Sequence, residues 1–250
     1  MSDRIAPSAL VSLWLVLGML CSGCGPDRIR GGGSGVASVG AASAALVGST
    51  THSSLRVELD FVTGLAPSPY AIGFLQRRLS ERCNKPGGVR VVRGRALPLT
   101  GLAEHEDEGL RKRIAGLAPL RAATSTLVVR ILYVDGRSAQ DRAAGRAHLG
   151  LSLGPRAIAV FPEQIRLNAS GVSAEELEGA LVLHEVGHLM GLVGRGAPLT
   201  GNHADLSRPS HCSTRPCVMA HSSADWGLGA LGEPDFCSTC VGDLQAAGGR

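Results

Sequence analysis

The segment LVLHEVGHLMGL at residues 181–192 constrains this chain most, because it places two histidines four residues apart in an apolar helical pattern. Ser173 and Glu176 precede it in the Ser-x-x-Glu arrangement of a helix-starting capping box. Gly191 stands where a helix can end in a left-handed conformation. We therefore expect a helix over residues 173–190, one face of which carries residues spaced by three and four: Leu177, Ala180, Leu181, His184 and His188.

Glu185 completes an HExxH pattern with the two histidines. Residues four apart on a helix lie about 6 Å apart along the axis and on nearly the same side, so both imidazoles can reach one cation. The glutamate beside them can take a proton from water that the cation activates. The segment indicates a zinc hydrolase, with His184 and His188 as metal ligands and Glu185 as the catalytic base.

The N-terminus indicates export. Residues 9–20 form an unbroken run of apolar or small residues, too short to span a bilayer, so residues 1–23 are predicted to be a signal peptide. The ending Leu-Cys-Ser-Gly-Cys at 20–24 resembles a bacterial lipobox, in which Cys24 would be lipidated. The alternative is an ordinary secretory signal. We expect the protein in the bacterial cell envelope, lipid-anchored, or else in the periplasm or outside the cell.

The composition after the signal predicts a tether and one domain. Residues 24–54 are rich in Gly, Ser, Ala and Thr, which favours a flexible tether, and residues 55–250 are enough for a single domain with a real core. The net charge of +4 is spread along the chain, and no basic cluster is interleaved with aromatic residues. Nothing therefore indicates a nucleic-acid partner, and membrane contact is expected only through the lipid anchor at Cys24.

Strand and helix patterns alternate within residues 55–250. The pattern predicts an α/β or α+β layer in which the HExxH helix packs against a mixed sheet. A nearly all-apolar stretch at 126–134 resembles a central strand buried on both faces. The other predicted elements are a half-buried strand at 55–61, a capped helix from 68 to about 84, a strand at 89–92, a charged surface helix at 104–115, and short strands at 148–153 and 157–161.

A second group of candidate metal ligands follows the helix. From His211 the chain has the pattern H-C-x4-C-x-M-x17-C-x2-C, formed by His211, Cys212, Cys217, Met219, Cys237 and Cys240. Together with HExxH and Gly191, this spacing resembles the archaemetzincins, a branch of the metzincin zinc peptidases, whose motif is HExxHxxGxxH followed by C-x4-C-x-M-x17-C-x2-C. Two long motifs in the right order seldom coincide by chance.

The resemblance implies an α+β metzincin-type fold with an α/β-like N-terminal layer, a mixed twisted sheet, an active-site helix and a small C-terminal subdomain. It implies a catalytic zinc with His211 as third ligand, and Met219 in the Met-turn beneath that metal. It also implies a second, structural zinc held by Cys212, Cys217, Cys237 and Cys240. Two disulfides are the alternative for these cysteines, because an exported chain meets an oxidising compartment.

The chain departs from the family pattern at the third histidine, where Gly194 stands. An insertion at residues 193–210 accounts for this, and longer loops cost only about 0.6 kcal/mol per doubling. His211 is the preferred third ligand because it directly precedes the matching cysteine, while His203 inside the insertion is the rival.

The function implied is a zinc-dependent metallopeptidase acting on a peptide or protein substrate through zinc-activated water and Glu185. One of the strands at 148–153 and 157–161 would form the upper rim of the cleft, where an extended peptide pairs. The alternative is a catalytically weak or inactive zinc-containing surface lipoprotein that serves as a binding or structural module.

Overall fold

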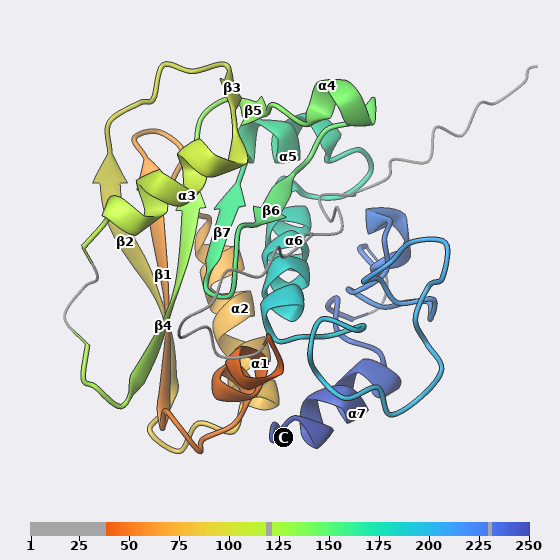
Figure 1. The fold of residues 1–250 in the computed structure, drawn as a ribbon. Helices are drawn as coiled ribbons and strands as arrows, with labels where there is room; N and C mark the ends of the chain where they lie inside the picture. The colour runs from red at the N-terminus through yellow and green to blue at the C-terminus, as the bar shows by residue number, and fades with distance from the viewer. Residues whose placement is uncertain (1–38, 119–121, 230–231) are drawn as a thin grey trace, which may run out of the picture.

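A five-stranded mixed sheet forms the centre of the computed structural model, which describes residues 39–118, 122–229 and 232–250 (Figure 1). The strand order is β2-β1-β4-β7-β6, and only the edge strand β6 runs antiparallel to its neighbour. The strands are β1 (Ser54–Val62), β2 (Val89–Leu97), β4 (Thr126–Tyr133), β6 (Gly150–Ser152) and β7 (Ala157–Val160). The predicted α+β class with a mixed sheet is confirmed.

Helices cover both faces of the sheet. On one face lie α1 (Val39–Val47), α2 (Pro69–Arg82) and α6 (Ala174–Leu189), and on the other lies α3 (Asp107–Gly116) (Figure 1). Each face has its own apolar cluster. The remaining elements are β3 (Glu104–His105), β5 (Arg137–Ser138), α4 (Asp141–Ala144), α5 (Pro162–Asn168), the 3-10 turn η1 (Ser223–Asp225) and α7 (Ser238–Ala246).

The expected half-buried pattern of the first strand is wrong at its polar positions. Glu58 and Asp60 in β1 are both at most 1% exposed. Arg130 lies 3.3 Å from a Glu58 carboxylate oxygen, and the backbone N–H of Arg95 donates to Asp60 at 2.8 Å. Because buried charges are tolerated when paired and hydrogen-bonded, both faces of this strand can be covered.

Helix α6 begins and ends as predicted. The Ser173 hydroxyl accepts the N–H of Glu176, whose side chain returns to the backbone of Ser173, so the capping box is confirmed. From Leu177 onward nearly every residue is buried, since the helix lies between the sheet, α2 and the C-terminal part of the chain. Gly191 then takes the left-handed conformation, with φ at 84°.

Gly191→Ala is expected to lower the free energy of unfolding by about 2 kcal/mol or more. A methyl group there would be strained by the backbone and would also meet Ser43 and the backbone nitrogen of Ala197, the latter at 2.6 Å. Gly194→Ala is the matched control: φ is 82° but nothing lies within 4 Å, so about 1 kcal/mol is expected. Urea denaturation of the metal-free variants measures both. An equal loss of unfolding free energy in the two variants would contradict a close contact between residue 191 and its neighbours.

The fold starts earlier than the sequence pattern predicts. The tether was expected to reach residue 54, but α1 is ordered and its Leu46 and Val47 are fully buried. Lys85 fixes this segment, because its ammonium donates to the carbonyls of Ala45, Gly48 and His52. The predicted signal peptide, Cys24 and the tether up to residue 38 lie outside the described residues. Among the described helices, none is both long and apolar enough to cross a membrane.

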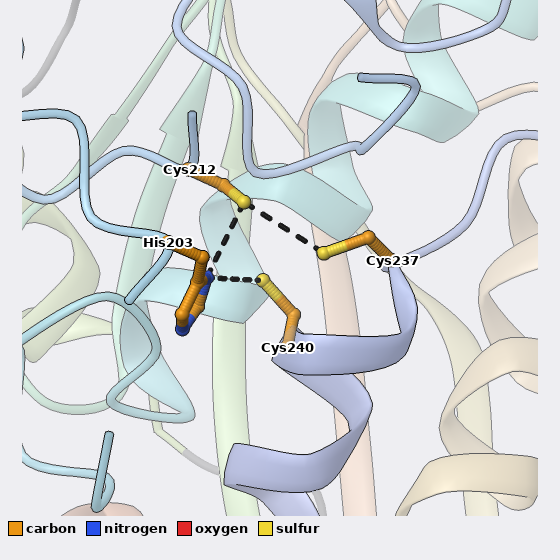
Figure 2. Close-up of side chains that lie close together, drawn as sticks. All are labelled: His203, Cys212, Cys237 and Cys240. Carbon is orange, nitrogen blue, oxygen red and sulfur yellow. Dashed lines mark hydrogen bonds between the residues drawn. The ribbon is translucent and has the colours of Figure 1, made fainter. Parts of the chain in front are cut away.

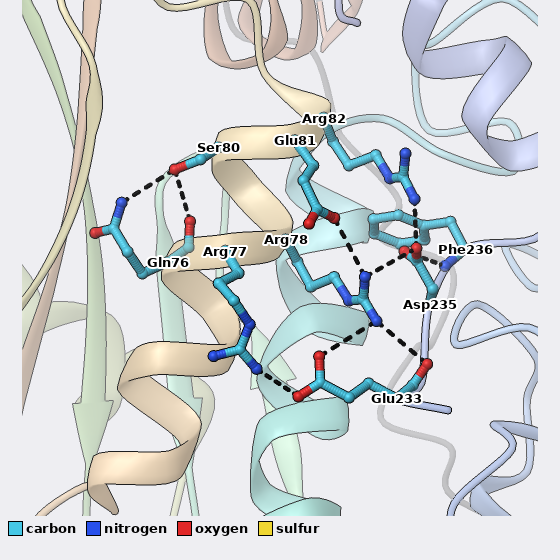
Figure 3. A network of polar contacts seen from close by, with 9 residues as sticks. All are labelled: Gln76, Arg77, Arg78, Ser80, Glu81, Arg82, Glu233, Asp235 and Phe236. Atoms are coloured by element: carbon cyan, nitrogen blue, oxygen red, sulfur yellow. Dashed lines mark hydrogen bonds and ion pairs between the residues drawn. The ribbon is translucent and has the colours of Figure 1, made fainter. Parts of the chain in front are cut away.

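Ion pairs attach the segment before α7 to helix α2 (Figure 3). Arg78, only 15% exposed, pairs with Glu233 at 3.5 Å and with Asp235 at 3.4 Å. Arg77 and Arg82 add further pairs to the same two carboxylates. The next residue, Phe236, packs close to Gly187: a Cβ added at this glycine would lie 3.0 Å from the Phe236 ring. The network therefore holds this segment on α2, and Phe236 packs beside Gly187 of the HExxH helix.

Candidate metal centres

His184, His188 and His211 come together as one buried group. One ring nitrogen from each lies within 4.8 Å of the others, and each side chain is at most 3% exposed. The Nε2 atoms of His184 and His188 are 3.1 Å apart. Helix α6 presents the first two histidines on one face, and the loop after the insertion brings His211 to them. The described structure does not place His203 in this group.

Backbone carbonyls orient two of these imidazoles, those of His184 and His211. The Nδ1 of His184 donates to the carbonyl of Val218 at 2.7 Å, and that of His211 to the carbonyl of Pro209 at 3.0 Å. This leaves Nε2 of His211 buried without a hydrogen-bond partner in the described residues. Such an atom is costly unless something binds it, and three convergent imidazole nitrogens are a donor set that zinc prefers.

Burial keeps the three imidazoles neutral, as metal binding requires. Loss of solvation lowers the pKa of His184 to about 3 and lowers the pKa of His188 and of His211 from the ordinary value. The residues present therefore fit a zinc ion, with Nε2 of His211 in the place of the third donor.

Met219 and Trp226 support the histidines from the C-terminal part of the chain. Met219 is fully buried, and its sulfur would collide with a Cβ at Gly187, which precedes His188. Trp226 stacks on the His184 ring at a centroid distance of 5.1 Å, and its indole N–H donates to the carbonyl of Ala220 at 2.7 Å. The motif indicated Met219, whereas nothing in the sequence pattern linked Trp226 to the site.

Glu185 is 2% exposed, and the Ser152 hydroxyl donates to its carboxylate at 2.7 Å. Burial raises the pKa of Glu185 to about 7. Ser152 belongs to β6, which is the edge of the sheet, whereas β7 is flanked by β4 and β6. Of the two strands proposed for the upper rim, β6 is thus the one with an open edge beside the glutamate. The sequence pattern did not single out Ser152.

The cysteines form a second group, and His203 lies among them (Figure 2). The Sγ of Cys212 is 3.7 Å from that of Cys237 and 3.3 Å from Nδ1 of His203, and the Sγ of Cys217 is 3.8 Å from that of Cys240. All cysteines of the described residues carry free thiols. Although burial lowers the pKa of His203, contacts with Cys212 and Asp243 raise it overall.

No family model matches the chain, and no curated protein matches its sequence. Among solved structures, the chain is similar to the crystal structure of archaemetzincin from Methanopyrus kandleri. The sequence identity is 20%, the TM-score is 0.47, and the similarity covers 78% of this chain and 96% of that one.

Proposed function

We propose that this protein is a zinc-dependent metallopeptidase that hydrolyses peptide bonds in peptides or proteins. The observation that carries this proposal is the unpartnered Nε2 of His211, buried beside the ring nitrogens of His184 and His188. Glu185 follows His184 directly and is hydrogen-bonded to the edge strand. A purely structural zinc site has no need for such a carboxylate, so its presence favours catalysis.

Zinc bound by the three histidines would supply Lewis acidity toward a carbonyl oxygen and lower the pKa of water. Glu185 then takes the proton of the attacking water and later passes it to the departing amine. The Ser152 hydroxyl orients the carboxylate by donating to it. The outer edge of β6 pairs with the backbone of an extended substrate, which sets the scissile carbonyl beside Glu185.

Removal of the metal tests this function. Treatment with a chelator is expected to lower hydrolysis of a fluorescence-quenched peptide library at least about 100-fold, and added zinc is expected to restore it. Activity that persists in metal-free protein would contradict the proposal. A folded, fully zinc-loaded protein without activity on any peptide would instead support the alternative of a zinc-containing surface module.

A further inference from the structure

Residues 211–219 belong to both metal sites, the first formed by three histidines and the second by the four cysteines. His211 is a member of the first site, and the next residue, Cys212, is a member of the second. The insertion at 193–210 separates His211 from α6, so the helix does not by itself fix the third imidazole. We propose that metal at the second site holds residues 211–219 in place and thereby raises the affinity of the first site for zinc.

The four cysteine sulfurs fit one zinc ion. Zinc–sulfur bonds of about 2.3 Å give tetrahedral edges of about 3.8 Å between sulfurs. The Sγ of Cys212 lies 3.7 Å from that of Cys237, and the Sγ of Cys217 lies 3.8 Å from that of Cys240. Each of these pairs joins the 211–219 stretch to the start of α7. Metal bound here therefore ties the stretch to α7, whereas thiols without metal make only weak hydrogen bonds.

The insertion is fastened beside the same sulfurs. The Nδ1 of His203 lies 3.3 Å from the Sγ of Cys212 and 3.6 Å from that of Cys240 (Figure 2). The Nε2 of His203 lies 2.8 Å from the Asp243 carboxylate, whose other oxygen accepts the N–H of Thr200 at 2.7 Å. Because these contacts depend on where the sulfurs lie, metal at the second site also orders the loop that leads into residues 211–219.

Backbone hydrogen bonds connect the cysteines to the first site. The N–H of Cys212 donates to the carbonyl of Met219 at 2.8 Å, which joins the two ends of the stretch. The N–H of Val218 donates to the carbonyl of Asp235 at 2.9 Å, and the carbonyl of Val218 accepts the Nδ1–H of His184 at 2.7 Å. Displacement of the cysteines therefore moves both the third imidazole and the carbonyl that orients an imidazole on α6.

These connections make metal binding at the two sites cooperative. Zinc at the first site requires all three imidazoles in place, so in metal-free protein part of its binding free energy must order residues 211–219. Metal at the second site orders them beforehand, which gives positive coupling without any contact between the two ions. Coupling between sites typically changes affinity by about 5- to 150-fold. The coupling rests on zinc binding at the first site and not on peptide hydrolysis.

Metal loading of the wild-type protein tests the coupling. The first site offers only nitrogen donors, so near-ultraviolet charge transfer from cysteine sulfur to cobalt(II) reports the second site alone. We expect one equivalent of cobalt to give this band and to slow hydrogen exchange at the amides of Cys212 and Val218. Exchange as slow in metal-free protein would overturn the proposal. A first equivalent bound without the band would also overturn it, because the first site would then be assembled while the cysteines are empty.

A double variant on α7 measures the coupling directly. Cys237→Ser with Cys240→Ser removes two sulfurs of the second site and none of the three histidines. Cobalt affinity of the first site, measured by visible absorption in competition with a chelator, should be about 5- to 150-fold weaker than in wild type whose second site already holds zinc. Cys83→Ser, at a buried cysteine outside both sites, is the matched control and should match wild type.

Equal first-site affinity in the double variant and the wild type would show that the sites are independent, and the proposal would be wrong. Where the double variant fails to fold, the exchange rates of the wild type decide. None of these measurements uses peptide hydrolysis, so the coupling and the proposed peptidase activity can fail separately.

Discussion

Glu185→Gln is expected to lower kcat for peptide hydrolysis by about 100- to 10,000-fold, the range that a positioned general base supplies. Glutamine has nearly the same shape and can still accept the hydrogen bond from Ser152, but it cannot take a proton from water. Zinc content should be unchanged, because the imidazoles of His184, His188 and His211 are untouched. Steady-state kinetics on a cleavable peptide, together with metal analysis, measure both quantities.

Glu178→Gln is the matched control on the same helix. Glu178 is partly buried and accepts the N–H of Ser68 at 3.1 Å, so it links α6 to the start of α2 rather than to the histidines. We expect kcat close to that of the wild type. If Glu185→Gln retained wild-type activity, or if both variants lost activity equally, the role of Glu185 as a base would be contradicted.

Elements whose signals are local could be predicted from the sequence. Helix α6 has its capping box, its apolar face and its terminal glycine within one short stretch, and its bounds match the prediction. The first helix and the buried carboxylates of β1 do not have such signals. Residues 39–47 look like a tether because they are small, yet small residues allow Ser43 to approach Gly191 closely. Burial of Glu58 depends on Arg130, which is far away in sequence.

The residues of the candidate metal centres could likewise be predicted only where the signal is local. HExxH places three side chains at fixed offsets on one helix, so His184, Glu185 and His188 can be grouped from sequence alone. Ser152, Trp226 and Asp243 reach the two centres only through tertiary contacts, and no spacing rule relates them to the motif. Loop closure costs nearly the same for either histidine, so the sequence preferred His211 only for its place before Cys212 and kept His203 as its rival. The structure distinguishes the two histidines by their surroundings. His203 lies among cysteine sulfurs, whereas His211 lies beside the imidazoles of His184 and His188.

His211→Ala should remove zinc from the first site and leave the second site filled. Loss of one of three protein ligands is expected to weaken zinc binding by more than about 100-fold, beyond the effect typical of an outer partner. Peptidase activity should fall with it. Metal analysis after dialysis against a chelator measures the loss. In cobalt(II)-substituted protein, near-ultraviolet charge transfer from cysteine sulfur to cobalt shows whether the second site is still filled.

His221→Ala is the control for this variant, because His221 is also buried and its ring packs edge-on against His211 at a centroid distance of 4.8 Å. Burial lowers the pKa of His221 to about 4, so it is a neutral imidazole within reach of the same region. The nitrogens of His184, His188 and His211 already converge without it, and we expect His221→Ala to keep its zinc. If His221→Ala emptied the first site while His211→Ala did not, the third ligand would be His221.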